Sequence, residues 1–565
     1  MNKVKKYIKK YRDSKERGRD YFKWLLSYTK PYMSRIILLM IISIALTYVG
    51  IGFSVVSKQI IDMAGNGKIT VPSIIAFMVL MVLTLVSGPV VNLFFDMIYE
   101  KYSFGIRKQV YDKIIRSVWL GTQKYHTGDM MTRMTSDAGN IANGMVNVIP
   151  NIIVFLIQLV MVFFILFVYS PILAIVALFL TPLGILGAYI LGSKLKFYQV
   201  KVQESETAYR SFIQESLANV LIVKAFSGED RFSNELSELR ENRYSWVWKK
   251  NKLSFGSNLV MNGTFQLGYA FAFIYAASQI SAGKITFGTM TLFLTLFARV
   301  QTPIAALAQQ LPGVVSIFAS AGRVMDIQDI PLEERNDESD INGTLGVKVN
   351  DISFAYDRDN VFTDVSFDIK PGEFVGIMGE SGIGKTTLIR LLMNFITPSK
   401  GEIFYYDTNE NKMSLSATVR QYVSYVPQGN TLFSGTIRKN ILIGKEDATD
   451  EEIWNALDMA VCKEFVEKLP EGLDTIIGEK GMGLSEGQAQ RLGLARALIR
   501  KSNFVILDEA TSALDENTES QLLKHLSEMT PRPTCILITH RKSVLDYCDR
   551  EFVLEGGNVK VKDID

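Results

Sequence analysis

Residues 374–392, FVGIMGESGIGKTTLIRLL, decide the fold of the C-terminal half of this chain. The stretch opens with five apolar or glycine residues, typical of a buried strand, and closes with leucine and isoleucine at helical spacing. A glycine-rich loop separates the two. Strand, loop and helix in this order form the context in which a phosphate-binding loop works, because glycines let backbone N–H groups turn toward an anion and the helix N-terminus adds positive potential.

Particular side chains of this loop have predicted roles. We expect Lys385 to reach the β and γ phosphates of a nucleoside triphosphate and the hydroxyl of Thr386 to ligate Mg²⁺. The residues expected to bind the nucleotide here are Gly379, Glu380, Ser381, Gly382, Ile383, Gly384, Lys385, Thr386 and Thr387. The predicted cofactors are therefore ATP and Mg²⁺.

A second apolar strand pattern, residues 504–507, ends in the adjacent acids Asp508 and Glu509. The carboxyl ends of strands in an open α/β sheet form the edge where ligands bind. One acid can organise the metal while the other polarises an attacking water. We expect Asp508 to hold Mg²⁺ and Glu509 to be the catalytic base of ATP hydrolysis.

Residues 484–491, LSEGQAQR, distinguish between classes of P-loop ATPases. Ser485 is a predicted helix N-cap, so its hydroxyl and the N–H groups after it would face an anion. The stretch resembles the signature of ABC transporters, with departures from the commonest form at Glu486 and Ala489. An acid in the first helical turn suits the helix dipole, and we expect Glu486 to point away from phosphate. The resemblance implies γ-phosphate contacts, across a dimer interface, from Ser485, Gly487 and Gln488.

Single residues elsewhere match further family positions. The resemblance implies that Tyr356 stacks on adenine and that His540 contacts the γ-phosphate. It also implies that Gln428 senses Mg²⁺ and the attacking water, contributes to the metal site and touches the membrane domain. The implied catalytic residues are Glu509, His540 and Gln428.

Three longer segments extend the resemblance to exporters. Residues 512–515 match the loop that crosses the dimer interface, and residues 432–437 match an exporter segment. Residues 475–481 match a segment that meets the coupling helices of the membrane domain. The resemblance implies a dimer, and a homodimer is favoured because both halves of the ATP site are present in the chain; a heterodimer is not excluded.

The N-terminal half carries six apolar runs long enough, at about 20 residues, to cross a bilayer core of about 30 Å. They lie roughly at 34–60, 70–99, 144–169, 171–195, 254–281 and 285–317. Short links with little charge alternate with two long connectors rich in Lys and Arg, residues 100–143 and 196–253. By the positive-inside rule, the long connectors and both termini face the cytoplasm.

Both long connectors have a helical pattern, since they lack Pro and Gly clusters and keep apolar residues at helical spacing. A helix from Pro171 to about Phe226 would run roughly 80 Å at about 1.5 Å per residue, far beyond the bilayer. Two turn-like breaks are predicted, at residues 126–137 and 223–229. They resemble the coupling segments through which exporter membrane domains rest on the ATPase domains.

Polar residues inside spans are costly and therefore candidates for function. The candidates for a cargo cavity are Arg299, Gln266, Asn262 and Gln158. In one interpretation they line a polar cavity that holds cargo. In the other, Arg299 snorkels or pairs with Asp96, and the amides bond between helices. The residues alone leave both interpretations open.

Composition limits the function classes. The net charge of +3 over 565 residues gives no support to a nucleic-acid partner. Basic residues cluster in residues 1–20, which we interpret either as a cytoplasmic tail beside membrane lipid or as a disordered tail. All three cysteines follow residue 460, and a disulfide framework is not expected.

The predicted fold is an all-α transmembrane domain of six helices followed by an α/β P-loop ABC ATPase domain with a helical subdomain. The predicted boundaries are 1–20 for the basic tail, 21–318 for the transmembrane domain, 319–344 for the linker and 345–565 for the ATPase domain. The predicted function is ATP-driven export across or between leaflets of a bacterial plasma membrane. The alternative is a membrane-anchored ABC regulator or channel.

The cargo is not identified by the sequence. A drug, a lipid or a peptide would each suit the fold, because one fold serves many cargoes. Arg299 points weakly to an anionic group on the cargo.

Overall fold

The computed structural model describes residues 19–335, 341, 343–356, 359–429, 431–478 and 481–564. The chain divides into two compact units. The helical unit comprises Met1–Tyr111 and Thr127–Ile327, and the sheet unit comprises Asp112–His126 and Gln328–Asp565. Most of the expected basic tail (1–18), and residues 336–340 and 342 of the expected linker, lie outside the described residues.

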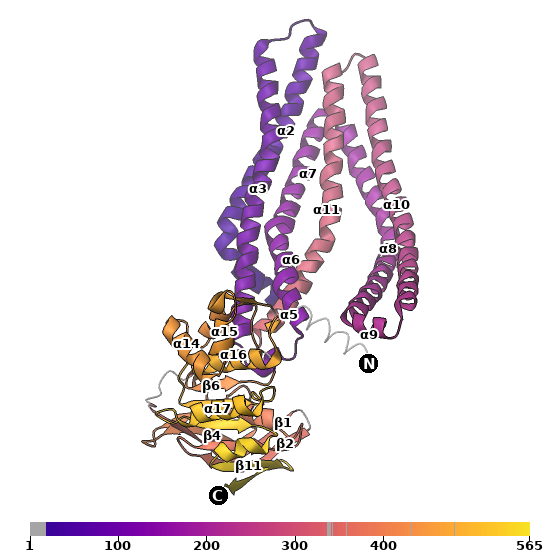
Figure 1. Cartoon of the computed structure of the whole chain (residues 1–565). Coiled ribbons are helices and arrows are strands. Elements are labelled where there is room, and N and C mark those ends of the chain that lie inside the picture. Colours follow the sequence, from indigo (N-terminus) through magenta and orange to yellow (C-terminus); the bar gives the residue numbers. More distant parts are fainter. Residues whose placement is uncertain are drawn as a thin grey trace, which may run out of the picture. The chain divides into compact units, whose positions relative to one another are not determined.

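The helical unit is built from long helices (Figure 1). They are α2 (Met33–Gly65), α3 (Val71–Arg116), α7 (Ile149–Tyr169), α8 (Pro171–Ala218), α10 (Glu229–Ser281) and α11 (Phe287–Gln328). Their common core lies between α7, α8, α10 and α11. Small side chains permit the close approach of these helices, namely Ala174, Ala177, Ala272 and Ala276, which are all buried.

Four helical stretches of the described chain are long and apolar enough to cross a membrane. They are Arg19–Gly65, Val71–Arg116, Thr127–Tyr169 and Phe287–Gln328. The fourth and fifth predicted spans lie in α8 and α10, which are long enough but are not among the four. In α10, the amides Asn258, Asn262 and Gln266 lower the mean hydropathy, so the fifth predicted span is the more polar kind of helix that packs within a bundle.

The second connector is helical, as predicted, but its first helix is shorter than expected. α8 ends at Ala218 rather than near Phe226, a length of roughly 72 Å at about 1.5 Å per residue. Asn219 ends it, because its side-chain amide donates to the carbonyl of Glu215 at 2.9 Å while its own backbone leaves the helical region. A short helix, α9 (Val220–Ala225), and a turn at residues 226–228 follow before α10 begins.

The first connector turns earlier than predicted. Residues 127–137, most of the expected break, are helical: α5 (Thr127–Thr132) continues into the π-helical η2 (Arg133–Asp137), then α6 (Ala138–Asn143), the π-helical η3 (Gly144–Val148) and α7. The Thr132 hydroxyl donates to the carbonyl of Gly128 at 2.8 Å, so this polar side chain is satisfied within the helix and does not need a turn. The true turn is residues 117–126, with α4 (Trp119–Thr122) at its centre.

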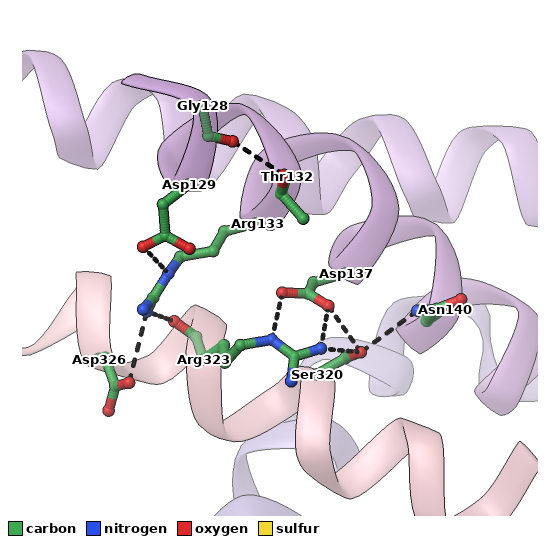
Figure 2. Close-up of polar contacts among 9 residues, drawn as sticks. All are labelled: Gly128, Asp129, Thr132, Arg133, Asp137, Asn140, Ser320, Arg323 and Asp326. Atoms are coloured by element: carbon green, nitrogen blue, oxygen red, sulfur yellow. Dashed lines mark hydrogen bonds and ion pairs between the residues drawn. The ribbon is translucent and has the colours of Figure 1, made fainter. Parts of the chain in front are cut away.

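A polar cluster joins α5, η2 and α6 to the last turns of α11 (Figure 2). The Asp137 carboxylate, only 1% exposed, accepts from Arg323 Nε at 2.8 Å and from Arg323 Nη2 at 2.5 Å. Ser320 Oγ donates to the same carboxylate at 2.8 Å. The buried Arg133 donates to the Arg323 carbonyl and pairs with Asp326 at 3.3 Å.

This cluster satisfies every group that it buries. A buried carboxylate is tolerated when it is paired and hydrogen-bonded, and losing one partner then leaves a costly buried charge. The π-helical turn of η2 brings Arg133 and Asp137 onto the face that meets α11. The cluster therefore fixes the start of α5–α7 against the end of α11.

The sheet unit contains a four-stranded sheet of order β2-β1-β4-β5, a six-stranded sheet of order β12-β11-β3-β10-β9-β6, and the pair β7-β8. The strands are β1 (Leu345–Tyr356), β2 (Asp359–Ile369), β3 (Phe374–Met378), β4 (Lys400–Asp407), β5 (Lys412–Ser414), β6 (Val423–Val426), β7 (Gly435–Thr436), β8 (Ile476–Ile477), β9 (Phe504–Asp508), β10 (Thr534–Ile538), β11 (Arg550–Glu555) and β12 (Asn558–Asp563). In the larger sheet, β11, β3, β10, β9 and β6 run parallel. Their carboxyl ends therefore share one edge.

Six α-helices accompany these strands in the described C-terminal part: α12 (Lys385–Leu392), α13 (Ile437–Leu442), α14 (Asp450–Met459), α15 (Lys463–Glu467), α16 (Glu486–Leu498) and α17 (Glu516–Ser527). One core lies between the two sheets and α12, and a second gathers α13–α17. The predicted fold class, a helical membrane domain followed by an α/β ATPase domain with a helical subdomain, is confirmed.

Candidate functional site

The predicted phosphate-binding loop lies between β3 and α12, as expected. Gly384 caps α12 with a φ of +115°, a backbone conformation that favours glycine. A Cβ at this position would come 2.8 Å from Val361 Cγ1 and 3.1 Å from Phe362 Cζ. Glu380, Ser381 and Gly382 are exposed on the open side of the loop, where a ligand can reach them.

Lys385 is buried at the base of the loop, 6% exposed. Its Nζ donates to the carbonyl of Gly379 at 2.9 Å and lies 2.9 Å from His540 Nε2. The carboxylate of Glu509 lies 3.8 Å from the same Nζ. The ammonium group is thus held at the loop by contacts that a phosphate group could replace.

The adjacent acids at the end of β9 have different environments. Asp508 is 2% exposed and accepts a hydrogen bond from the Tyr425 hydroxyl at 3.2 Å. Burial raises the pKa of Asp508, the Tyr425 hydrogen bond opposes that shift, and the neighbouring Glu509 charge adds to it. Glu509 has a φ of +51°, and its N–H donates to the carbonyl of Ile538 at 3.1 Å. This strained backbone turns the Glu509 side chain out of the strand.

The Glu509 carboxylate is held at both oxygens. Oε2 accepts from Gln428 Nε2 at 2.7 Å, and Oε1 lies 3.1 Å from His540 Nε2. Lys385, Gln428, Glu509 and His540 come from four separate segments and meet at the carboxyl edge of the larger sheet. The structure therefore brings together the three predicted catalytic residues and the loop lysine.

Tyr356 ends β1, and its ring packs edge-on against Phe354 with centroids 4.8 Å apart. Its hydroxyl accepts from Arg390 Nη1 at 3.3 Å. Thr387 is buried and Thr386 half-buried at the start of α12.

The predicted N-cap of α16 is confirmed. Ser485 Oγ accepts from the N–H of Gln488 at 3.3 Å, while Gln488 Oε1 accepts from the N–H of Ser485 at 2.9 Å. Glu486 is exposed, and Ala489 is buried in the helical core. Within the described residues, no hydrogen bond or ion pair links residues 484–491 to residues 379–387.

Sequence reasoning missed several supporting residues. Gln490 donates to Ser512 Oγ at 3.2 Å and accepts from the N–H of Ala513 at 3.1 Å, which couples α16 to the predicted interface loop. Arg541 supports the other side of that loop by donating to the carbonyl of Leu514 at 2.9 Å. The available signal was position in the sequence, because Gln490 lies within the signature stretch and Arg541 directly follows His540.

Within the described part of the chain, no hydrogen bond or ion pair joins any two of the four polar candidates of the helical unit. Asn262 and Gln266 are exposed on α10, and Gln158 is half-buried on α7. Arg299 lies against α2, where a Cβ on Gly50 would come 2.9 Å from its Nη1. No ion pair joins Arg299 to Asp96 among the described residues.

Comparisons with known proteins agree with this geometry. The family model for the ABC transporter transmembrane region matches residues 36–304, and the model for the ABC transporter ATP-binding region, described as "ABC transporter", matches residues 362–512. The ATP-dependent lipid A-core flippase of Syntrophus aciditrophicus is 30% identical over 457 residues, covering 80% of this chain and 76% of that protein. The uncharacterized ABC transporter ATP-binding protein YwjA of Bacillus subtilis is 28% identical over 551 residues, covering 94% of each.

A solved structure supports the fold. A bacterial Atm1-family ABC exporter with ATP bound superposes with a TM-score of 0.78 and 23% identity, covering 95% of each chain. The transmembrane region and the ATP-binding region occur in one chain, and the relatives are ATP-driven transporters. This chain therefore belongs to the ABC transporter family, as an exporter-type half-transporter whose ATPase domain hydrolyses ATP to drive movement across a membrane.

Proposed function

We propose that two copies of this chain form an exporter that moves an amphipathic, lipid-like cargo across or between the leaflets of a bacterial plasma membrane. The observation that carries this proposal is the convergence of Lys385, Glu509 and His540 at one edge of the sheet. Among the residues that the structure describes, no hydrogen bond or ion pair joins the signature residues to that set. One chain thus presents two separate halves of an ATP site.

Glu509 is the proposed catalytic base. Gln428 and His540 orient its two carboxylate oxygens, which prepares one of them to take a proton from the attacking water. Lys385 exchanges its contacts with Gly379 and His540 for phosphate oxygens when ATP binds. His540 is then free to contact the γ-phosphate.

The residues present fit a Mg²⁺ ion. Asp508, Thr386 and Gln428 Oε1 supply the oxygen donors that Mg²⁺ prefers. The buried Asp508 carboxylate has a raised pKa because burial opposes its charge, and a nearby cation would offset that cost. When bound, Mg²⁺ neutralises charge on the β and γ phosphates.

The dimer follows from the separated halves of the site. Ser485, Gly487 and Gln488 of one copy would close on the phosphates held by residues 379–387 of the other. A helix N-terminus attracts anions, and the α16 N-terminus is exposed. Mass measurement of the purified single gene product distinguishes the homodimer from a heterodimer, which would need a second polypeptide for ATP hydrolysis.

The cargo proposal rests on the relatives and on Arg299. Two relatives at 30% identity are named ATP-dependent lipid A-core flippases. Arg299 has no acidic partner among the described residues, so its charge is available to an anionic headgroup. Asn262, Gln266 and Gln158 would add hydrogen bonds to the cargo if they line its path. The positive charge of the two long connectors supports a topology in which both termini and the ATPase domain lie in the cytoplasm.

The test uses the protein reconstituted in vesicles with a fluorescent lipid. Glu509→Gln should bind ATP normally and lower turnover at least 100-fold, because a positioned base contributes roughly 10²–10⁴. The matched control is Glu528→Gln, an exposed acid at the C-cap of α17. Normal phosphate release by Glu509→Gln would remove this residue as the base.

A second comparison tests the cargo. The wild-type protein should move an anionic lipid faster than a neutral one with the same acyl chains, and Arg299→Gln should reduce that preference. Equal transport of both lipids by the wild-type protein would leave ATP-driven export standing and discard the anionic cargo.

A further inference from the structure

Arg390 contacts two residues that lie far apart in the sequence, Tyr356 and Trp119. It lies in the last turn of α12, the helix that begins at Lys385. Its Nη1 donates to the hydroxyl of Tyr356 at 3.3 Å, and its guanidinium lies over the Trp119 ring, 4.8 Å from the centroid. A guanidinium within about 6 Å of an aromatic centroid is attracted to the ring face. One cation thus joins the proposed adenine-stacking ring to the turn of the first connector.

Trp119 belongs to the first connector tip, which we define as residues 117–126. Its ring packs against Phe395 with centroids 6.3 Å apart. Arg420 also lies over Phe395, with its guanidinium 4.3 Å from the ring centroid. Arg420 also pairs with Glu333 at 2.7 Å, in the segment that follows α11. The stacked groups Arg390, Trp119, Phe395 and Arg420 therefore form one continuous contact.

The first connector tip and the segment after α11 are also joined by their backbones. The N–H of Val118 donates to the carbonyl of Pro331 at 3.0 Å, and the N–H of Glu333 donates to the carbonyl of Arg116 at 3.0 Å. A Cβ on Gly121 would come 2.5 Å from Ile330 Cγ2. A displacement of Trp119 therefore moves both chain segments that connect to the helical unit in sequence.

We infer that Arg390 is a positioning residue that conveys occupancy of the adenine site to the first connector tip. This inference rests on the proposed stacking of adenine on Tyr356. A base stacked on that ring restricts the phenol, and the hydrogen bond then restricts the guanidinium that lies on Trp119. The signal depends on the base of the nucleotide, whereas the phosphates are bound by the loop before α12.

The charge of Arg390 also acts on two ionisable groups at the carboxyl edge of the larger sheet, Tyr425 and Asp508. Its charge lowers the pKa of Tyr425 and of Asp508, against the larger raising effect of burial on both. An Arg390 variant therefore changes hydrolysis as well as coupling. The experiment needs a readout at Trp119 itself.

The test measures Trp119 emission in the detergent-purified dimer, taken as the spectrum of the wild-type protein minus that of Trp119→Phe. Saturating ATP should change this emission, and saturating CTP should change it at least 5-fold less, because a pyrimidine stacks over a smaller area. Arg390→Met, which keeps the length and removes the charge, should abolish the response to ATP. Arg390→Met should also raise the KM for ATP relative to that for CTP.

The matched control is Arg532→Met, which removes another arginine stacked on a ring, 4.3 Å from the Phe374 centroid, away from Tyr356 and Trp119. It should retain the response to ATP. An unchanged response in Arg390→Met, or equal responses to ATP and CTP in the wild-type protein, would overturn the inference. Failure of the wild-type protein to hydrolyse ATP is a distinct result, because it would contradict the proposed function instead.

Discussion

The two connector tips have similar lengths and opposite surroundings. In the first connector tip, Trp119 is packed between Arg390 and Phe395 of the same chain. In the second connector tip, which we define as residues 219–228, Leu221 is 76% exposed and Phe226 is 81% exposed. Exposed apolar side chains grouped in one short segment mark a contact surface. The first tip is packed within its own chain, whereas the exposed apolar side chains of the second tip favour a contact with a partner.

The sheet unit carries exposed apolar side chains of its own. They are Phe433, Ile476 and Met482, in or beside the segments that resemble exporter elements. We expect these side chains of one copy to contact the second connector tip of the other copy in the proposed dimer. Residues 479–480 of that region lie outside the described residues.

The largest expected loss of stability comes from the polar cluster around Asp137, which follows the first connector tip in the sequence. Asp137→Ala leaves Arg323 and Ser320 without their shared buried acceptor and should destabilise the helical unit by about 2–3 kcal/mol. Thermal unfolding in detergent measures this loss. Asp230→Ala, at an exposed position in the first turn of α10, is the control and should shift the apparent Tm little. A small shift for Asp137→Ala would show that the first connector does not need this anchor.

The second largest effect is expected when a charge is introduced into the second connector tip. Phe226→Asp should leave the monomer fold intact, since the ring is exposed, but should weaken coupling between copies by about 2 kcal/mol, roughly 30-fold. Cargo-stimulated ATP hydrolysis measures coupling, and ATP binding is the internal control. Unaltered stimulation would contradict the contrast between the tips, because it would mean that the exposed Phe226 ring contacts no partner.

A crowding substitution probes the first connector tip. Gly121→Val places atoms against Ile330 and should cost about 1–3 kcal/mol through overpacking. Ile330→Ala in the same chain should recover part of the loss. Gly128→Val, where no atom lies within 4 Å of the added Cβ, is the matched control. Equal effects of the two glycine variants would argue against tight packing at this tip.

The smallest effect is expected at the turn of the second connector tip. Ser227 has a φ of +49°, so Ser227→Gly relieves strain at some cost in the entropy of the unfolded chain. The net change in unfolding free energy should be about 0.5 kcal/mol or less. Ser233→Gly, within the regular helix α10, should instead destabilise by about 0.5–1 kcal/mol.

The local motifs were predictable from the sequence. The glycines before Lys385, the acids after β9 and the N-cap at Ser485 each follow from a few adjacent residues whose backbone needs are fixed by their type. The alternation of short and long connectors was also predictable, because local charge and hydropathy define it. The turn of the first connector was predicted in the wrong place because Thr127–Asp137 carries polar residues that are typical of a turn. In the structure, the Thr132 hydroxyl bonds to the carbonyl of Gly128 in the same helix, and the Asp137 carboxylate bonds to Arg323 of α11.

The contacts between distant residues were not predictable. Asp137 and Arg323 lie 186 positions apart, and Trp119 meets Arg390 and Phe395 only in the folded sheet unit. Nothing in either local stretch specifies which distant side chain will face it, because such pairs depend on how whole elements pack. The sequence by itself determined the ATP-binding loop, the acids and the apolar helices. Only the tertiary structure decided that one connector tip is enclosed by its own chain while the other remains open to a partner.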